Sequence, residues 1–277
     1  MNSKLKPVRI DPSFFTKRDD TLVTWLGMAG AAINSRGTIL FIDPLISVVR
    51  QNGEEIVDSG HRLIIHLPLE AKDVPKADAV LYTHADADHF GRATAQEFSA
   101  RLKPTFIALP PVISLIGELG VDQEHMITAT DFQHIQVGNV EVVVTPTLHN
   151  FKRDPEPWKR GDCSGFLVKT PDGTIWHPGD TRLIDDLLAI RGVDVLFFDV
   201  APVEAHLGSE GSARLAQTCG AKVMVAYHYG TFDLPSGTWG SCDPEGALPY
   251  VKGLSAQFLL LSPGELLRLP LLQWRRT

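Results

Sequence analysis

The chain has 277 residues, of which 44% are hydrophobic and 21% charged, values that supply a sizeable core and exclude a mainly disordered or fibrous protein. Its 26 Lys and Arg residues against 33 Asp and Glu residues give a formal net charge of −7. An acidic surface repels a phosphate backbone, so we expect no nucleic-acid partner. One large domain is the starting expectation, because α/β folds of this length often stay undivided.

No segment of the sequence predicts a membrane span or a secretory leader. The longest uncharged apolar stretch, 105–117, is far shorter than the roughly 20 residues that a spanning helix needs. Residues 1–20 are polar and mixed in charge. The three cysteines are far apart and form no C-x-x-C pattern, which argues against a disulfide framework. We therefore expect a cytoplasmic protein with an N-terminal extension over 1–21 and a single domain over 22–277.

Apolar runs that end in turns predict a series of short strands. Strands are expected at 22–26 and 38–42, before an insertion or surface cover over 45–72 that has no clear period. A buried strand at 79–82 precedes a helix over 91–101. The later elements are a helix over 209–219 and strands at 140–145, 165–170, 174–177, 193–200 and 222–227. No internal repeat is present.

Side chains of the metal-ligand type follow several of these strands. His84, Asp86, Asp88 and His89 lie within six residues, directly after the strand at 79–82. A run so dense in imidazole and carboxylate groups would cost much in repulsion and desolvation unless a cation held it together. The alternative is a solvated acidic turn with hydrogen-bonded histidines. Three later strand ends add groups of the same type, namely His149, Asp180 and His228.

The order and context of these residues resemble the metallo-β-lactamase superfamily. There an H-x-H-x-D-H loop is followed by a single His, a bridging Asp in a G-D-T context and a final His. The resemblance covers residues 22–264. Within the superfamily, the turn at 43–44, the segment 163–166 and especially the segment 228–232 resemble the L-ascorbate-6-phosphate lactonase-like branch. The resemblance implies a four-layer αβ/βα sandwich of α/β class that houses a dinuclear metal hydrolase.

The resemblance also implies how seven side chains would share two metal ions: His84, Asp86 and His149 at the first ion, Asp88, His89 and His228 at the second, and Asp180 between both. Position 86 departs from the family pattern, which usually has His there. With this carboxylate, two divalent ions, three carboxylates and a bridging hydroxide sum to zero charge, which makes a weaker Lewis acid. The additional hard oxygen favours manganese, then iron, then zinc.

The implied chemistry is hydrolysis. Two ions can lower the pKa of a bridging water to near neutrality and supply hydroxide, while one ion polarises a carbonyl or phosphoryl oxygen. Asp88 and Asp180 are the candidate catalytic residues, because ligands close to the nucleophile could pass a proton to the leaving oxygen. The expected substrate is a lactone or related ester of a small anionic molecule such as a sugar phosphate.

Candidate substrate contacts lie near the expected ligands. Arg182 closely follows Asp180, His177 precedes it by three residues, and His206 lies in the loop after the strand at 193–200. A basic loop just after His149 could also capture an anion, although an ordinary solvated loop explains it as well. Its cations are Lys152, Arg153, Lys159 and Arg160.

Three other functions fit the same residues. The first is phosphodiester hydrolysis, as in phospholipase D-like relatives, because the same hydroxide can attack phosphorus. The second is di-iron redox chemistry, which some superfamily members with a carboxylate at the position of Asp86 perform, although no flavin-binding motif accompanies it here. The third is a metal-stabilised binding protein with little catalysis. Exposed hydrophobic edges in this fold are also compatible with a homo-oligomer.

Overall fold

The computed structural model describes residues 5–150 and 158–271, and it contains two large sheets. The first sheet has the order β16 (Leu266–Leu269), β1 (Thr21–Gly27), β2 (Gly30–Ser35), β3 (Thr38–Ile42), β6 (Ala79–Leu81), β7 (Thr105–Ala108) and β8 (Met126–Thr128). The second has the order β15 (Gln257–Leu259), β14 (Val223–Tyr227), β13 (Val195–Asp199), β12 (Gly173–His177), β11 (Ser164–Thr170), β10 (Val140–Pro146) and β9 (His134–Val137).

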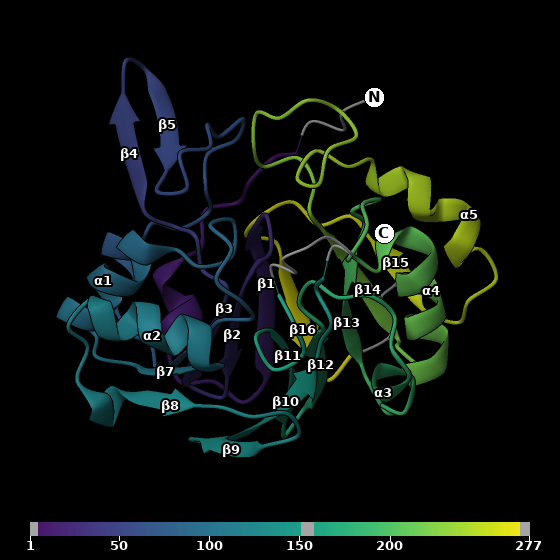
Figure 1. Cartoon of the computed structure of the whole chain (residues 1–277), viewed down its shortest axis with the longest axis horizontal. Coiled ribbons are helices and arrows are strands. Elements are labelled where there is room, and N and C mark those ends of the chain that lie inside the picture. Colours follow the sequence, from purple (N-terminus) through teal and green to yellow (C-terminus); the bar gives the residue numbers. More distant parts are fainter. Residues whose placement is uncertain (1–4, 151–157, 272–277) are drawn as a thin grey trace.

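Helices cover the outer faces of both sheets (Figure 1). On one side of the molecule lie α1 (Arg92–Arg101) and α2 (Pro110–Glu118), and on the other lie α3 (Asp185–Leu188), α4 (Gly208–Cys219) and α5 (Leu248–Val251). Four short 3₁₀ segments, at Pro12–Phe15, Ala71–Asp73, Gln123–His125 and Pro244–Ala247, complete the elements in the described part of the chain. The predicted αβ/βα sandwich is confirmed.

Alternation along the strands builds the layers. In β1, Val23 and Trp25 belong to the core between the two sheets, whereas Leu22 and Leu26 belong to the core under the helices α1 and α2. Side chains of a strand point alternately to opposite faces, so a strand that is covered on both faces has no solvent-exposed position. This explains why the burial of β1 is continuous.

The predicted elements correspond to observed ones in most of the chain. The strands expected at 22–26, 38–42 and 79–82 are β1, β3 and β6, and those expected at 165–170 and 174–177 are the antiparallel pair β11 and β12. The region 45–72 contains a two-stranded hairpin of β4 (Val48–Gln51) and β5 (Glu54–Val57), which projects from the body of the molecule (Figure 1).

The segment before β1 packs against the domain. Phe14 and Phe15 are buried in the core under the first sheet, and the Val8 amide donates a hydrogen bond to the Pro263 carbonyl. Among the described residues, none of the helices is both long enough and apolar enough to cross a membrane.

Candidate metal centre

The candidate ligands lie at the carboxyl ends of strands from both sheets. Residues 84–89 follow β6, while His149 follows β10, Asp180 follows β12 and His228 follows β14. Strands β12, β13 and β14 run parallel, as do β3 and β6, so the carboxyl ends of the strands in each set lie at the same edge of their sheet. The fold thus brings together groups that are far apart in the sequence.

The first group consists of His84, Asp86 and His149. One ligand atom of each lies within 4.8 Å of those of the other two. Asp86 Oδ2 is 3.4 Å from Nε2 of both histidines. Burial raises the pKa of Asp86, but its contacts with His149 and His84 outweigh burial and hold the pKa far below its ordinary value. The group therefore presents an ionised carboxylate between two imidazole nitrogens.

The second group consists of Asp88, His89, Asp180 and His228, whose ligand atoms also lie within 4.8 Å of one another. His89 Nε2 is 3.2 Å from Asp180 Oδ2 and 3.3 Å from His228 Nε2. Asp180 Oδ2 is also 4.0 Å from Nε2 of His84 in the first group. Asp180 thus lies between the two groups, where a bridging ligand would have to be.

Two buried carboxylates, which the sequence analysis did not assign to the site, lie behind the histidines. Asp43 Oδ2 is 2.8 Å from His89 Nδ1. Asp199 Oδ1 is 2.9 Å from His228 Nδ1, and its Oδ2 is 3.1 Å from Nδ1 of His206. A carboxylate that accepts from Nδ1 fixes the tautomer and leaves Nε2 as the ligand atom, as at many metal sites. Asp43 and Asp199 are fully buried.

The remaining two histidines are oriented in the same way by neutral acceptors. His149 Nδ1 is 3.1 Å from the Ala205 carbonyl oxygen. His84 Nδ1 is 3.0 Å from the Thr83 hydroxyl, which itself donates to Asp43. Each imidazole of the two groups is therefore held at Nδ1 and directs Nε2 inward.

Unpartnered atoms at the centre fit a metal ion. His84 Nε2 and Asp180 Oδ1 are buried and have no hydrogen-bond partner among the described residues. Buried polar atoms are rarely left so, and an ion is one of the few explanations. Burial lowers the pKa of His84 and keeps it in the neutral form that binds metals. The donor set of imidazole nitrogens and carboxylate oxygens suits zinc, iron or manganese.

The charged groups of the centre shift the pKa values of one another. Burial raises the pKa of Asp180, but the charges of His228 and His89 outweigh burial and hold the pKa well below its ordinary value. For His89, burial lowers the pKa, and the carboxylates of Asp180 and Asp88 more than compensate, so the pKa lies well above its ordinary value. Metal ions entering the site would replace such protons.

The three predicted substrate contacts lie in different surroundings. His206 belongs to the centre, because its Nε2 is 3.6 Å from Asp180 Oδ2. Burial lowers the pKa of His206, but Asp180 and Asp199 raise it to about 9. His177 is fully buried, donates from Nε2 to the Ala29 carbonyl and accepts the Gly179 amide at Nδ1. Both of its ring nitrogens are thus engaged, which favours a positioning role over the predicted substrate contact.

The cations that we expected to face an anionic substrate are partly engaged elsewhere. Arg182 donates to Asn150 and to the Glu204 carboxylate. Arg160 forms ion pairs with Asp186 and Asp131. Lys152 and Arg153 lie outside the described residues.

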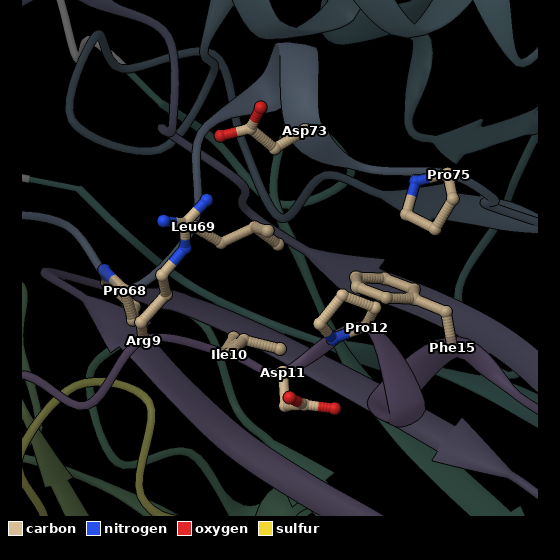
Figure 2. A pocket seen from close by; sticks show the side chains of 9 residues that line it. All are labelled: Arg9, Ile10, Asp11, Pro12, Phe15, Pro68, Leu69, Asp73 and Pro75. Carbon is tan, nitrogen blue, oxygen red and sulfur yellow. The ribbon is translucent and has the colours of Figure 1, made fainter.

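One cavity lies beside the metal centre, and another lies apart from it. The first, of about 510 Å³, has His206, Glu210 and Asp243 among its lining residues. A second, of about 580 Å³, lies between residues 9–15 and 68–75 (Figure 2). Its lining includes none of the ligand candidates, so it is a separate feature of the N-terminal segment.

The comparison with known families agrees with this geometry. Residues 38–229 match the family model described as the beta-lactamase superfamily domain. The chain belongs to the metallo-β-lactamase superfamily. A "UPF0173 metal-dependent hydrolase" from Pyrobaculum arsenaticum is 27% identical over 256 residues, covering 89% of this chain and 99% of the relative.

Solved structures share the fold. The metallo hydrolase Igni18 from Ignicoccus hospitalis superposes with a TM-score of 0.67 at 19% identity, over 91% of this chain and 99% of that chain. The diiron β-hydroxylase CmlA from Streptomyces venezuelae gives a TM-score of 0.65 at 17% identity, over 92% of this chain and 55% of that chain. At these identities the likeness concerns the fold.

Proposed function

We propose that this chain is a metal-dependent hydrolase that uses two divalent ions to cleave a lactone or related ester of a small molecule. The observation that carries the proposal is a pair of buried atoms, His84 Nε2 and Asp180 Oδ1, that have no hydrogen-bond partner in the described part of the chain and lie among imidazoles held at Nδ1. The name that its relatives carry, metal-dependent hydrolase, supports the reaction class.

The metal ions and the side chains of the centre would have different roles in hydrolysis. When bound, the two ions would acidify a water molecule and polarise the substrate carbonyl. Asp180, placed between the two groups, would hold both ions at a fixed separation. The Asp88 side chain is 14% exposed, whereas His84 and His89 are fully buried, so Asp88 lies toward solvent and is suited to pass a proton to the leaving oxygen.

The lactone specificity rests on the segment 228–232, whose contacts are mainly structural. Tyr229 stacks on Trp25 and donates a hydrogen bond to the Leu261 carbonyl, and the Thr231 hydroxyl accepts the Met28 amide. These contacts hold the turn after His228 and so support the shape of the site. The choice among esters therefore has to be made by assay.

The charge of the substrate is similarly a matter for assay. Glu204 and Asn150 accept hydrogen bonds from Arg182, and the lining of the cavity beside His206 includes two acidic residues. An anionic substrate would depend on the basic loop after His149. A screen should therefore contain neutral and phosphorylated lactones, together with a chromogenic phosphodiester.

The test begins with metal analysis of protein purified without chelators or added metal. We expect about two equivalents of manganese, iron or zinc per chain, and hydrolysis of at least one lactone or ester. Asp180→Ala and His89→Ala should lose both the metal and the activity. Full activity in either variant, or a chain that stays metal-free after incubation with each ion, would refute the proposal. Cleavage of the phosphodiester alone would replace the lactone by that substrate class.

Di-iron redox chemistry is the second candidate, because the first group contains the carboxylate of Asp86 and the fold is shared with a diiron hydroxylase. It predicts that iron-loaded protein consumes oxygen when a reductant is supplied. The absence of oxygen consumption in protein shown to contain two irons would eliminate it.

A further inference from the structure

The two oxygens of Asp86 have different neighbours. Oδ2 faces Nε2 of His84 and of His149, at 3.4 Å from each. Oδ1 accepts a hydrogen bond from the indole N–H of Trp158, at 3.1 Å. The carboxylate therefore offers one oxygen to the first group, while the other oxygen is held from outside it.

Asp86 needs such an anchor more than its neighbours do. Its side chain is 37% exposed, against 0% for His84 and 2% for His149. An exposed carboxylate can rotate about its terminal torsion and exchange its hydrogen bonds with water. The half-buried indole of Trp158 lies edge-on to the His84 ring, with 6.4 Å between the ring centroids, and so covers the same group.

The kind of anchor also matches the kind of ligand. The histidines are held by acceptors at Nδ1, whereas Asp86 is held by a donor. A histidine at position 86 would offer Trp158 an N–H or a metal-bound nitrogen on that side and no carboxylate oxygen. Asp86 and Trp158 are thus chemically suited to each other.

We propose that Trp158 is the positioning residue that keeps Asp86 a single-oxygen ligand of the first metal ion. Carboxylates bind metals through one oxygen or through both. Chelation through both would occupy a second coordination position, and the indole N–H prevents it by holding Oδ1. A position then stays open for water or substrate at the first ion. This inference rests on the proposed two-metal function.

The test compares Trp158→Phe with the wild-type chain and with a matched control, Trp239→Phe. Trp239 is also half-buried, but it packs against His61 and Phe232, which lie outside the metal centre. Equilibrium dialysis of the metal-free proteins against manganese gives the affinity of each site. Trp158→Phe should change the affinity of one of the two sites 10- to 100-fold, the range typical when a hydrogen bond behind a ligand is lost, and leave the other unchanged. Trp239→Phe should leave both unchanged.

A double-mutant cycle with Asp86→His separates positioning from packing. Once the carboxylate is gone, Trp158→Phe should change the first-site affinity less than twofold, because there is no oxygen left to hold. An equal change of the first-site affinity with and without Asp86→His would mean that Trp158 acts only through packing. That result would overturn the proposal. Equal melting temperatures of the metal-free Trp158→Phe and wild-type proteins would show that the fold is intact.

A cobalt spectrum tests the same point without the Asp86 variant. When Oδ1 is released, Asp86 can chelate, so the visible absorption of cobalt at the first site should lose intensity as its coordination number rises. An unchanged spectrum in Trp158→Phe would overturn the proposal, even with a lower affinity. If the wild-type chain binds no ion at the first group, the proposed function fails as well. If it binds two and Trp158→Phe matches it, only this inference fails.

Discussion

Asp199→Asn tests whether the carboxylate behind the histidines controls metal binding. Asp199 accepts three hydrogen bonds, from the Ala201 amide and His228 at Oδ1 and from His206 at Oδ2, at 2.9, 2.9 and 3.1 Å. Asparagine keeps the shape but has one acceptor oxygen and one NH₂ group. In the orientation that keeps more hydrogen bonds, the amide oxygen of the asparagine still accepts from the Ala201 amide and from His228. Its NH₂ group then faces the N–H of His206.

The magnitude follows from what each histidine loses. His228 would be held by a neutral amide oxygen instead of a carboxylate, which makes Nε2 a weaker donor to the metal. At Nδ1, His206 would lose its carboxylate acceptor and face an NH₂ group instead. Substitutions of this kind cost 10- to 100-fold in metal affinity, or about 1.4–2.7 kcal/mol. The free energy of unfolding of the metal-free protein should fall by about 1–3 kcal/mol, because the amide keeps two of the three hydrogen bonds and leaves the buried N–H of His206 without its acceptor.

The assay is competition for manganese or zinc against a fluorescent chelator, with Asp194→Asn as control. Asp194 lies next to the start of β13, where it accepts the Thr174 amide and pairs with Lys222, away from the metal centre. We expect the control to bind metal like the wild-type chain and Asp199→Asn to lose affinity at the second group. Two ions bound to Asp199→Asn with wild-type affinity would refute the role given to this carboxylate.

Three further predictions concern ligation, packing and surface charge. Asp180→Ala should bring the metal content by elemental analysis close to zero, because both groups share this carboxylate. His177→Phe should lower the free energy of unfolding by about 1–3 kcal/mol in urea titrations, because the buried Ala29 carbonyl loses its donor. The hydrogen bond from Arg50 lowers the pKa of Glu70 from 4.5 to about 2, so this pair stabilises the fold above pH 4.5 and less as the pH falls toward 2. Glu70→Gln should therefore lower the free energy of unfolding by less than about 1 kcal/mol at neutral pH. The difference from the wild-type chain should shrink in acid.

The ligand candidates were predictable because their signal is local and dense. Six residues from His84 to His89 contain four groups of the ligand type, and each later candidate lies within three residues of the end of an apolar strand. Strands of five to seven buried residues are also easily recognised, and β10 to β14 lie close to where the sequence predicts them.

Features that depend on long-range pairing were missed. Asp199 is a single carboxylate at the end of a buried strand, and its role comes from the register in which it lies opposite Tyr227, next to His228. β2 is not among the strands that the sequence predicts, because Gly30, Ala31 and Ala32 lack bulky alternating side chains. Its place between β1 and β3 buries it on both faces, where small residues fit. A strand that ends in Asp after buried apolar residues is a signal that could have identified Asp199.

The structure changes the interpretation of Asp86, which stands where the family usually has histidine. In the sequence, the aspartate in place of histidine at position 86 is the reason to consider a metal-stabilised binding protein with little catalysis. In the structure, Asp86 places one oxygen at equal distances from two histidine nitrogens, and Trp158 holds the other. A broken site would leave this exposed carboxylate without a fixed orientation. The Asp86 carboxylate accepts a hydrogen bond from Trp158. The aspartate at position 86 is therefore no longer an argument for a non-catalytic function.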